Sequence, residues 1–230
     1  MLKILSLLAC LTYLPALAQG YEAKYDMLWS AGLTLEAEAT ETLKKNGERY
    51  QIILDAKATI GSANETTNLL YLPESGWRPL DYSYTQNILG RTKGRHFRFN
   101  WNTGMLTWLH QPGRDELPIP TNTLDPLGFR LQLAHLLINE KDLPKTVNML
   151  DGNEIKIRTI SKGNLEILDI PYGRIKARKF ILTEDNPAPE RSFEFWLAPS
   201  LDYQLVKLQK RDKKRLFALT LKAFKTARTP

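Results

Sequence analysis

The sequence predicts an all-β protein, an antiparallel barrel or half-barrel of roughly a dozen strands with one helix, at about residues 126–139, packed on its concave side. Two observations predict the strands. Apolar and polar residues alternate along most of the chain, and turn sequences such as Asn46-Gly47 separate the alternating runs. A third observation predicts the helix, because apolar residues recur at helical spacing only after Asp125-Pro126.

The chain begins with a segment typical of a secretory signal peptide. A short basic start, Met1–Lys3, precedes the apolar run Ile4–Leu14, and Pro15–Ala18 ends that run with small residues where signal peptidase cuts. We therefore expect residues 1–18 to be a signal peptide cleaved after Ala18, and residues 19–230 to form a single β-rich domain.

The only cysteine, Cys10, lies inside this leader. Leu7-Leu8-Ala9-Cys10 resembles a lipobox, but only six residues separate Lys3 from Cys10, whereas a signal peptide has an apolar region of about 7–15 residues. Cleavage after Ala18 is therefore favoured, and it leaves a mature chain without cysteine. No second apolar stretch approaches the length of a membrane span, so we expect no transmembrane segment after cleavage.

The N-terminal half reads as a series of hairpins. Tyr21, Ala23, Tyr25, Met27 and Trp29 share one face of the first run, as in a half-buried strand. The following runs are separated by turn sequences, and one more strand is expected between the turns at residues 61–64 and 73–76. The other expected strands are Leu33–Thr40, Tyr50–Ile60, Leu80–Ile88, Phe97–Trp101 and Met105–His110. In the fourth of these, Phe99 and Trp101 are expected to face the interior.

The predicted helix follows a proline-rich approach that contains Pro112, Pro118 and Pro120. Leu127, Leu131, Ala134 and Ile138 form one stripe that should contact the sheet, while Arg130, Gln132 and Asn139 fall off that stripe. Such a helix could act as a lid or a plug. The expected strands after it are Thr146–Leu150, Glu154–Ile160, Asn164–Ile170, Arg174–Leu182, Arg191–Ala198, Tyr203–Lys210 and Arg215–Phe224.

Several short motifs, taken in order, resemble a family of bacterial exported proteins, DUF3108. They are the opening run Tyr25–Leu35, Trp77–Tyr84, Phe99–Gly104, the helix start Leu124–Leu127, and Trp196–Pro199 with Val206-Lys207. One departure is Gln204, where the family pattern implies a proline or another apolar residue. The resemblance implies an all-β envelope protein of Gram-negative bacteria, located in the periplasm, and it supplies no catalytic residues.

No catalytic or metal-binding constellation is apparent. The three histidines, His96, His110 and His135, are scattered and lack ligand spacing, so we expect no metal site and no cofactor. Glu36 and Glu38 share a strand face but read as solvated residues. No nucleophile elbow is present. Outside the cytoplasm we expect no nucleic-acid partner. We therefore expect a protein that is not an enzyme.

Two features suggest a ligand. Aromatic residues fall on strands expected to share the concave face, where they either fill a core or line a pocket, and basic residues cluster on hairpins. The candidate ligand-binding residues are Trp29, Phe97, Phe99, Trp101, Trp108 and Phe195, with Arg91 and Arg95 at the rim. The leading hypothesis is a periplasmic protein that holds an acyl chain or another amphipathic envelope component.

The alternative is an envelope adaptor that docks on a partner protein by strand addition or through its basic hairpins. A cavity of roughly 300 Å3 or more favours the carrier. A filled barrel with a free, uncharged edge strand favours the adaptor.

Overall fold

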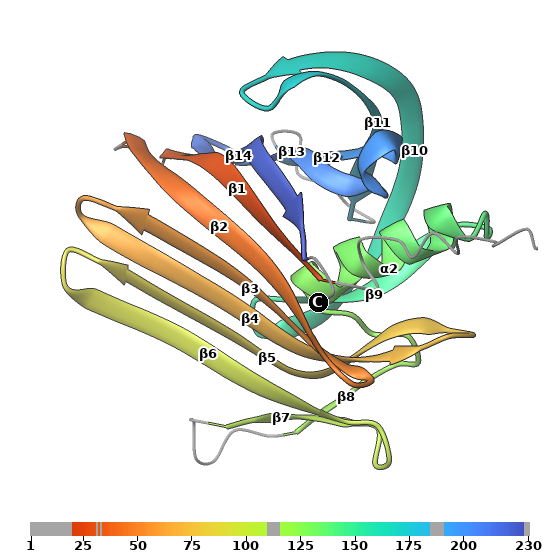
Figure 1. Cartoon of the computed structure of the whole chain (residues 1–230). Coiled ribbons are helices and arrows are strands. Elements are labelled where there is room, and N and C mark those ends of the chain that lie inside the picture. The colour runs from red at the N-terminus through yellow and green to blue at the C-terminus, as the bar shows by residue number, and fades with distance from the viewer. Residues whose placement is uncertain (1–19, 31, 33, 110–115, 185–190, 228–230) are drawn as a thin grey trace, which may run out of the picture.

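The computed structural model describes residues 20–30, 32, 34–109, 116–184 and 191–227. The predicted signal peptide and Cys10 lie outside these residues. Within them, fourteen strands form one antiparallel sheet that curves around a single α-helix, as Figure 1 shows. The prediction of an all-β, barrel-like fold with one helix on its concave side is therefore confirmed.

The sheet follows the chain as two meanders joined at their ends. β1 pairs with β14, and all other strands pair with their neighbours in the chain, so the order is β8-β7-β6-β5-β4-β3-β2-β1-β14-β13-β12-β11-β10-β9. The strands of the first meander are β1 (Tyr21–Ser30), β2 (Thr34–Asn46), β3 (Arg49–Ala58), β4 (Gly61–Leu72), β5 (Gly76–Ile88), β6 (Arg91–Asn100), β7 (Met105–Trp108) and β8 (Leu117–Pro118). Those of the second are β9 (Thr146–Asp151), β10 (Glu154–Ile170), β11 (Gly173–Thr183), β12 (Arg191–Ala198), β13 (Gln204–Asp212) and β14 (Arg215–Thr226), with the short 3₁₀ helix η1 (Pro199–Leu201) between β12 and β13.

The two edges of the sheet approach each other without forming a direct ladder. The segment between β8 and the helix bridges them. Leu124 forms a parallel bridge with Met149, its amide donates to the carbonyl of Asn148 at 2.9 Å, and its carbonyl accepts from the amide of Leu150 at 2.8 Å. The Asn148 side chain also donates to the carbonyl of Thr121 at 3.3 Å, so this connecting segment, and not a pairing of β8 with β9, joins the two edges.

One predicted break between strands is instead a bulge. The sequence break at residues 161–163 separates two expected strands, but β10 continues through it as one strand of 17 residues. The register with β11 shifts between Lys162 and Leu165. An added Cβ on Gly163 would lie 3.2 Å from the carbonyl oxygen of Lys179. A residue without a side chain thus suits this close approach. The long hairpin of β10 and β11 bends over the top of Figure 1.

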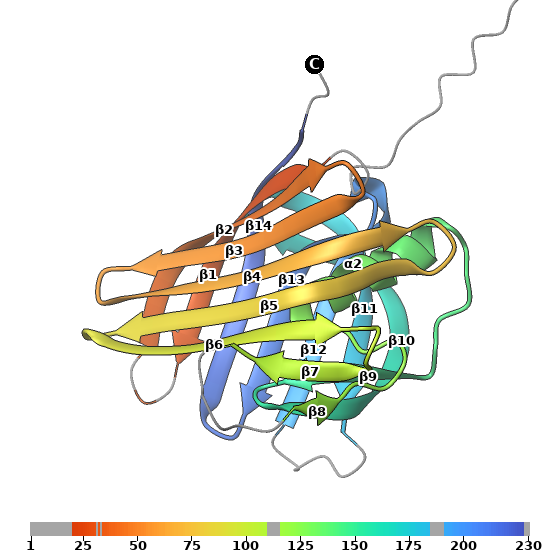
Figure 2. The ribbon, with the colours of Figure 1, turned by 90° about the horizontal axis from the view of Figure 1, so that it is seen from below.

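The helix α2 (Pro126–Ile138) lies inside the curve, between the two meanders, as the view from below in Figure 2 shows. Asp125 caps its first turn: one carboxylate oxygen accepts from the amides of Leu127 and Gly128, both at 3.0 Å, and from the Thr67 hydroxyl of β4 at 2.7 Å. This contact fixes the start of the helix to the sheet.

The expectation that Arg130 lies off the buried stripe was wrong. The sheet covers the helix on more than one side, so Arg130 and His135 are buried together with apolar residues. The far end is also held, because Gln132 accepts from the amide of Trp77 at 2.7 Å and Lys141 donates to the carbonyl of Glu74 at 2.9 Å. A helix anchored at both ends suits a plug better than a moving lid.

Two hydrophobic clusters fill the interior. The larger one lies between the helix and both meanders, and includes Tyr25, Phe129 and Phe195. The smaller one lies under β5–β7; its buried members are Tyr82, Phe97, Phe99, Leu106, Ile119 and Leu150. Among the described residues, no helix has the length and apolar character needed to cross a membrane.

Candidate functional site

A cavity of about 510 Å3 lies on the concave side of the sheet, beyond the first turn of the helix. Pro126, Leu127 and Arg130 of the helix contribute to its floor. Its apolar wall comes from β1–β4 and β12–β14, through Met27, Trp29, Leu35, Leu54, Ala56, Ala58, Ala63, Phe193, Leu208, Phe217 and Leu219. The sheet curves around a helix that is too short to fill it, and the cavity is the space left over.

One part of the lining, here called the polar wall, carries the charged and hydrogen-bonding groups. Tyr84 and Gln86 of β5 and Arg95 of β6 contribute to it, and Asp151 and Lys210 approach from β9 and β13. The polar wall adjoins the apolar wall, because Lys210 pairs across the strands with Phe217 and lies beside the Phe193 ring. This arrangement can bind an amphipathic molecule, because hydrocarbon is favoured along the apolar wall and a charged or hydrogen-bonding group along the polar wall.

Two cations are held along the polar wall. The Arg95 guanidinium lies 5.8 Å from the centre of the Tyr84 ring and reaches toward the turn after β9, where an added Cβ on Gly152 would lie 3.6 Å from it. The Lys210 ammonium lies 5.7 Å from the Phe193 ring centre and 3.9 Å from an Asp151 oxygen. Both cations keep a face toward the cavity.

Asp151 is held ionised in this setting. Burial alone would raise its pKa, but Lys210 and Arg158 outweigh burial and hold the pKa of the carboxyl below its usual value. Arg158 also pairs with Glu184, so the charges at this side of the barrel form a linked group.

Glu65 of β4 stands at the floor of the cavity. One carboxyl oxygen accepts a hydrogen bond from the Tyr82 hydroxyl at 2.8 Å. Burial raises the pKa of Glu65 from 4.5 to about 7, and the bond from Tyr82 and the charge of Arg130 only partly oppose that rise. The carboxyl lies deep in the barrel, and its remaining exposure is to the cavity that it lines.

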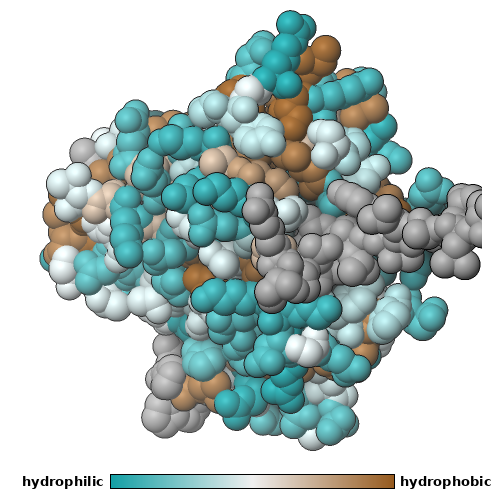
Figure 3. Space-filling model, in the orientation of Figure 1, coloured by the Kyte–Doolittle hydropathy of each residue, from teal (hydrophilic) through white to brown (hydrophobic). Residues whose placement is uncertain are grey.

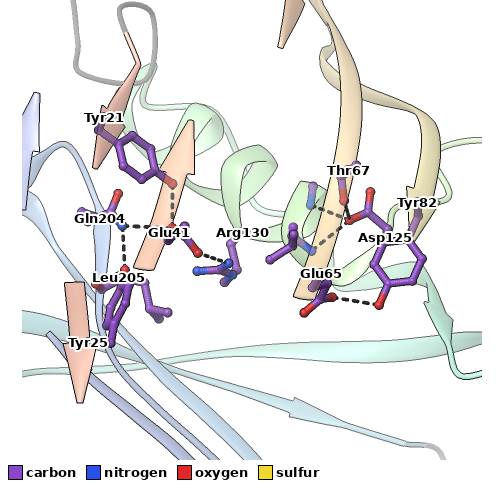
Figure 4. Close-up of polar contacts among 12 residues, drawn as sticks. Tyr21, Tyr25, Glu41, Glu65, Thr67, Tyr82, Asp125, Arg130, Gln204 and Leu205 are labelled. Atoms are coloured by element: carbon purple, nitrogen blue, oxygen red, sulfur yellow. Dashed lines mark hydrogen bonds and ion pairs between the residues drawn. The ribbon is translucent and has the colours of Figure 1, made fainter. Parts of the chain in front are cut away.

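A buried charge network lies behind this floor (Figure 4). Arg130 of the helix forms an ion pair with Glu41 of β2, whose side chain is fully buried. The Tyr21 hydroxyl donates to Glu41 at 2.7 Å, and the Gln204 amide donates to Glu41 at 3.3 Å and to the Tyr25 hydroxyl at 2.8 Å. Burial alone would lower the pKa of Arg130, but Glu41 outweighs it and the pKa is raised. Burial raises the pKa of both tyrosines.

The structure places the residues predicted to bind a ligand in different parts of the molecule, and only two of them line the cavity. Trp29 and Arg95 line the cavity. Phe97 and Phe99 belong to the smaller hydrophobic cluster, with Trp101 and Trp108 packed against it, and Phe195 belongs to the larger one. Phe99 is buried as expected, while Trp101 is half-buried and donates to the carbonyl of Pro79 at 2.6 Å. Arg91 is exposed on the β5–β6 hairpin, away from the lining.

Sequence reasoning missed Glu41, Glu65 and Arg130. A signal for Glu41 was present, because it shares strand parity with Ala39 and Leu43, which face the core. In the sequence, Gln204 is only a departure from the family pattern. Its polar side chain is needed where the structure places it, between Tyr25 and Glu41.

Comparisons with known proteins give a family and a shared fold. The family model described as "Protein of unknown function (DUF3108)" matches residues 21–214. The crystal structure of a beta-barrel-like protein of the domain of unknown function DUF1849, from Brucella abortus, is similar with a TM-score of 0.60 and 10% identity, over 91% of this chain and 98% of that one. A protein of Parabacteroides distasonis, provisionally named a lipoprotein, gives a TM-score of 0.33 and 11% identity, over 90% and 95% of the two chains. No curated protein matches significantly.

Proposed function

The chain belongs to the DUF3108 family of proteins of unknown function, and we propose that it is a non-enzymatic periplasmic protein that binds an acyl chain or another amphipathic envelope component in its cavity. The periplasmic location rests on the predicted signal peptide. The binding role rests on one observation: a cavity of about 510 Å3 whose lining joins a broad apolar wall to a few polar and charged side chains.

The size and lining of the cavity support this role. Binding sites for small molecules usually measure about 300–1,000 Å3 and combine an apolar lining with a few polar groups. Each methylene of a bound chain that leaves water for the cavity makes the binding free energy more favourable by about 0.8 kcal/mol. Leu54, Phe217 and Leu219 offer the surface for that transfer.

The polar wall supports an anionic head. Arg95 and Lys210 both line the cavity, and Lys210 shares Asp151 with other cations. A carboxylate or phosphate placed between them would gain charge-assisted hydrogen bonds. Asp151 beside Lys210, and Glu65 at the floor when ionised, would repel an anion, so the head belongs beside Arg95 and the hydrocarbon along β1–β4.

The adaptor hypothesis has less support. Strand addition needs an exposed edge strand, and both edges of this sheet are blunted. β8 has two residues, one of them Pro118, which has no amide hydrogen to donate. β9 at the other edge already bonds to Leu124. A cavity in place of a filled interior also favours the carrier.

The proposal predicts that filling the cavity abolishes binding. Ala63 of β4 lines the cavity, so Ala63→Trp should place an indole in the space of the hydrocarbon. We expect the affinity for a dansyl-labelled fatty acid, measured by fluorescence titration, to fall at least about ten-fold. Thr85→Trp is the matched control, because Thr85 is exposed on the neighbouring strand β5 and does not line the cavity.

Both variants should be checked for folding by circular dichroism and urea unfolding. The proposal would be contradicted if the wild-type chain did not bind the probe. It would equally be contradicted if Ala63→Trp, still folded, bound as tightly as Thr85→Trp.

A further inference from the structure

Two hairpin tips lie side by side where the cavity reaches the strand ends. We call them the mouth tips: Thr59–Ile60 between β3 and β4, and Leu89–Gly90 between β5 and β6. The amide of Leu89 donates to the carbonyl of Ile60 at 3.0 Å, which joins them. An open depression of about 500 Å3 between the tips shares Ala58, Gly61 and Ser62 with the lining of the cavity. The mouth tips therefore lie next to the cavity, although none of their four residues lines it.

Leu89 adopts a backbone conformation that leucine seldom accepts. Its φ is +51° and that of Gly90 is +78°, as in the two-residue turn that normally carries asparagine, aspartate or glycine. The turn is held in place, because the amide of Gly90 donates to the side chain of Asn87 at 3.2 Å. A branched side chain costs stability in this conformation.

Burial does not offset the strain at Leu89, since this residue is 70% exposed, more than any other large hydrophobic residue that the structure describes. Figure 3 shows hydrophobic surface at the left edge of the molecule, where Figure 1 places the ends of these hairpins. A strained, exposed leucine at a fixed position is better explained by something that it contacts outside the chain.

The charged residues around the mouth tips indicate the sign of the charge on that partner. Arg91 and Lys93 begin β6 just after Gly90 and are exposed, and within the described part of the chain neither forms an ion pair. Lys57 on the neighbouring hairpin is paired with Asp55 at 3.3 Å. Apolar tips flanked by unpaired cations are the combination that holds peripheral proteins on anionic lipid.

We propose that the mouth tips dock on the surface of an anionic lipid bilayer, with Leu89 and Ile60 at the headgroup boundary and Arg91 and Lys93 against the headgroups. This orientation turns the cavity toward the membrane. The docking goes beyond ligand binding and is tested separately from it.

The test is co-sedimentation of the mature chain with vesicles of phosphatidylcholine alone and of phosphatidylcholine mixed with phosphatidylglycerol. We expect binding only to the anionic vesicles. Leu89→Asn removes the apolar side chain and suits the positive φ, so the chain should stay folded while its partition onto anionic vesicles falls at least about five-fold. Arg91→Gln with Lys93→Gln should lower it roughly 25-fold, since each cation near such a surface contributes about five-fold.

Ile167→Asn is the matched control, because Ile167 is 59% exposed on β10, outside the mouth tips. Its partition should equal that of the wild type. The proposal is overturned if the wild type does not bind anionic vesicles, if Leu89→Asn binds them as well as the wild type, or if Ile167→Asn is equally impaired. Titration with the dansyl-labelled fatty acid in solution separates the two ideas, because Leu89→Asn should bind that probe normally.

Discussion

Replacing Arg130 with methionine is expected to lower the free energy of unfolding by about 3–5 kcal/mol. Glu41 is fully buried and Arg130 is its ion-pair partner, so the substitution leaves a carboxylate in the interior without its cation. Tyr21 and Gln204 still donate to Glu41, but neither carries the compensating charge. Urea unfolding followed by tryptophan fluorescence measures the loss.

The double variant Arg130→Met with Glu41→Gln is the control. Glutamine keeps an acceptor for Tyr21 and removes the buried charge, so the double variant should be clearly more stable than Arg130→Met alone. A loss of less than about 1 kcal/mol in the single variant would show that the pair does not hold the helix against β2. The same conclusion would be drawn if the double variant were less stable than Arg130→Met alone.

Replacing Glu65 with glutamine is expected to stabilise the protein above neutral pH by about 1–3 kcal/mol and to leave it little changed near pH 5. The pKa of Glu65 is raised to about 7 in the folded chain, against an ordinary 4.5. Between these values the folded chain binds a proton that the unfolded chain has released. This contribution to stability is complete below pH 4.5 and is lost as the pH rises through 7. The range given allows for screening by the cavity that the carboxyl borders.

Urea unfolding of the wild type and of Glu65→Gln at about pH 5 and about pH 8 tests the direction of this pH dependence. Burial also raises the pKa of Asp125, but that group is common to both proteins and cancels in the comparison. A stability difference that stayed constant between the two pH values, or grew toward low pH, would contradict the raised pKa.

The strands could be predicted because alternation is a local property. Tyr21, Ala23 and Tyr25 face the core as their parity requires, and the cap at Asp125 is specified by the residues beside it. A bulge, in contrast, is not specified by the residues next to it in the sequence. Gly163 lies in a predicted break between two strands, and pairing with β11, which resumes after a register shift, keeps the strand continuous.

The candidate site was harder to predict because strand parity gives a face, not a location. Phe97 and Trp29 both lie on inward faces, yet one is sealed in the smaller cluster and the other lines the cavity. The buried charged residues could not be predicted for a related reason. Glu41 and Arg130 are 89 residues apart, and each reads as a solvated residue until its partner is known.

Native mass spectrometry of the chain purified from the periplasm tests the central claim most directly. The wild-type protein should carry an adduct that organic extraction identifies as an acyl-chain lipid, and Ala63→Trp, prepared alongside Thr85→Trp, should lack it. Unliganded protein in all three preparations, or the same adduct on Ala63→Trp as on the wild type, would contradict a ligand-binding role for the cavity.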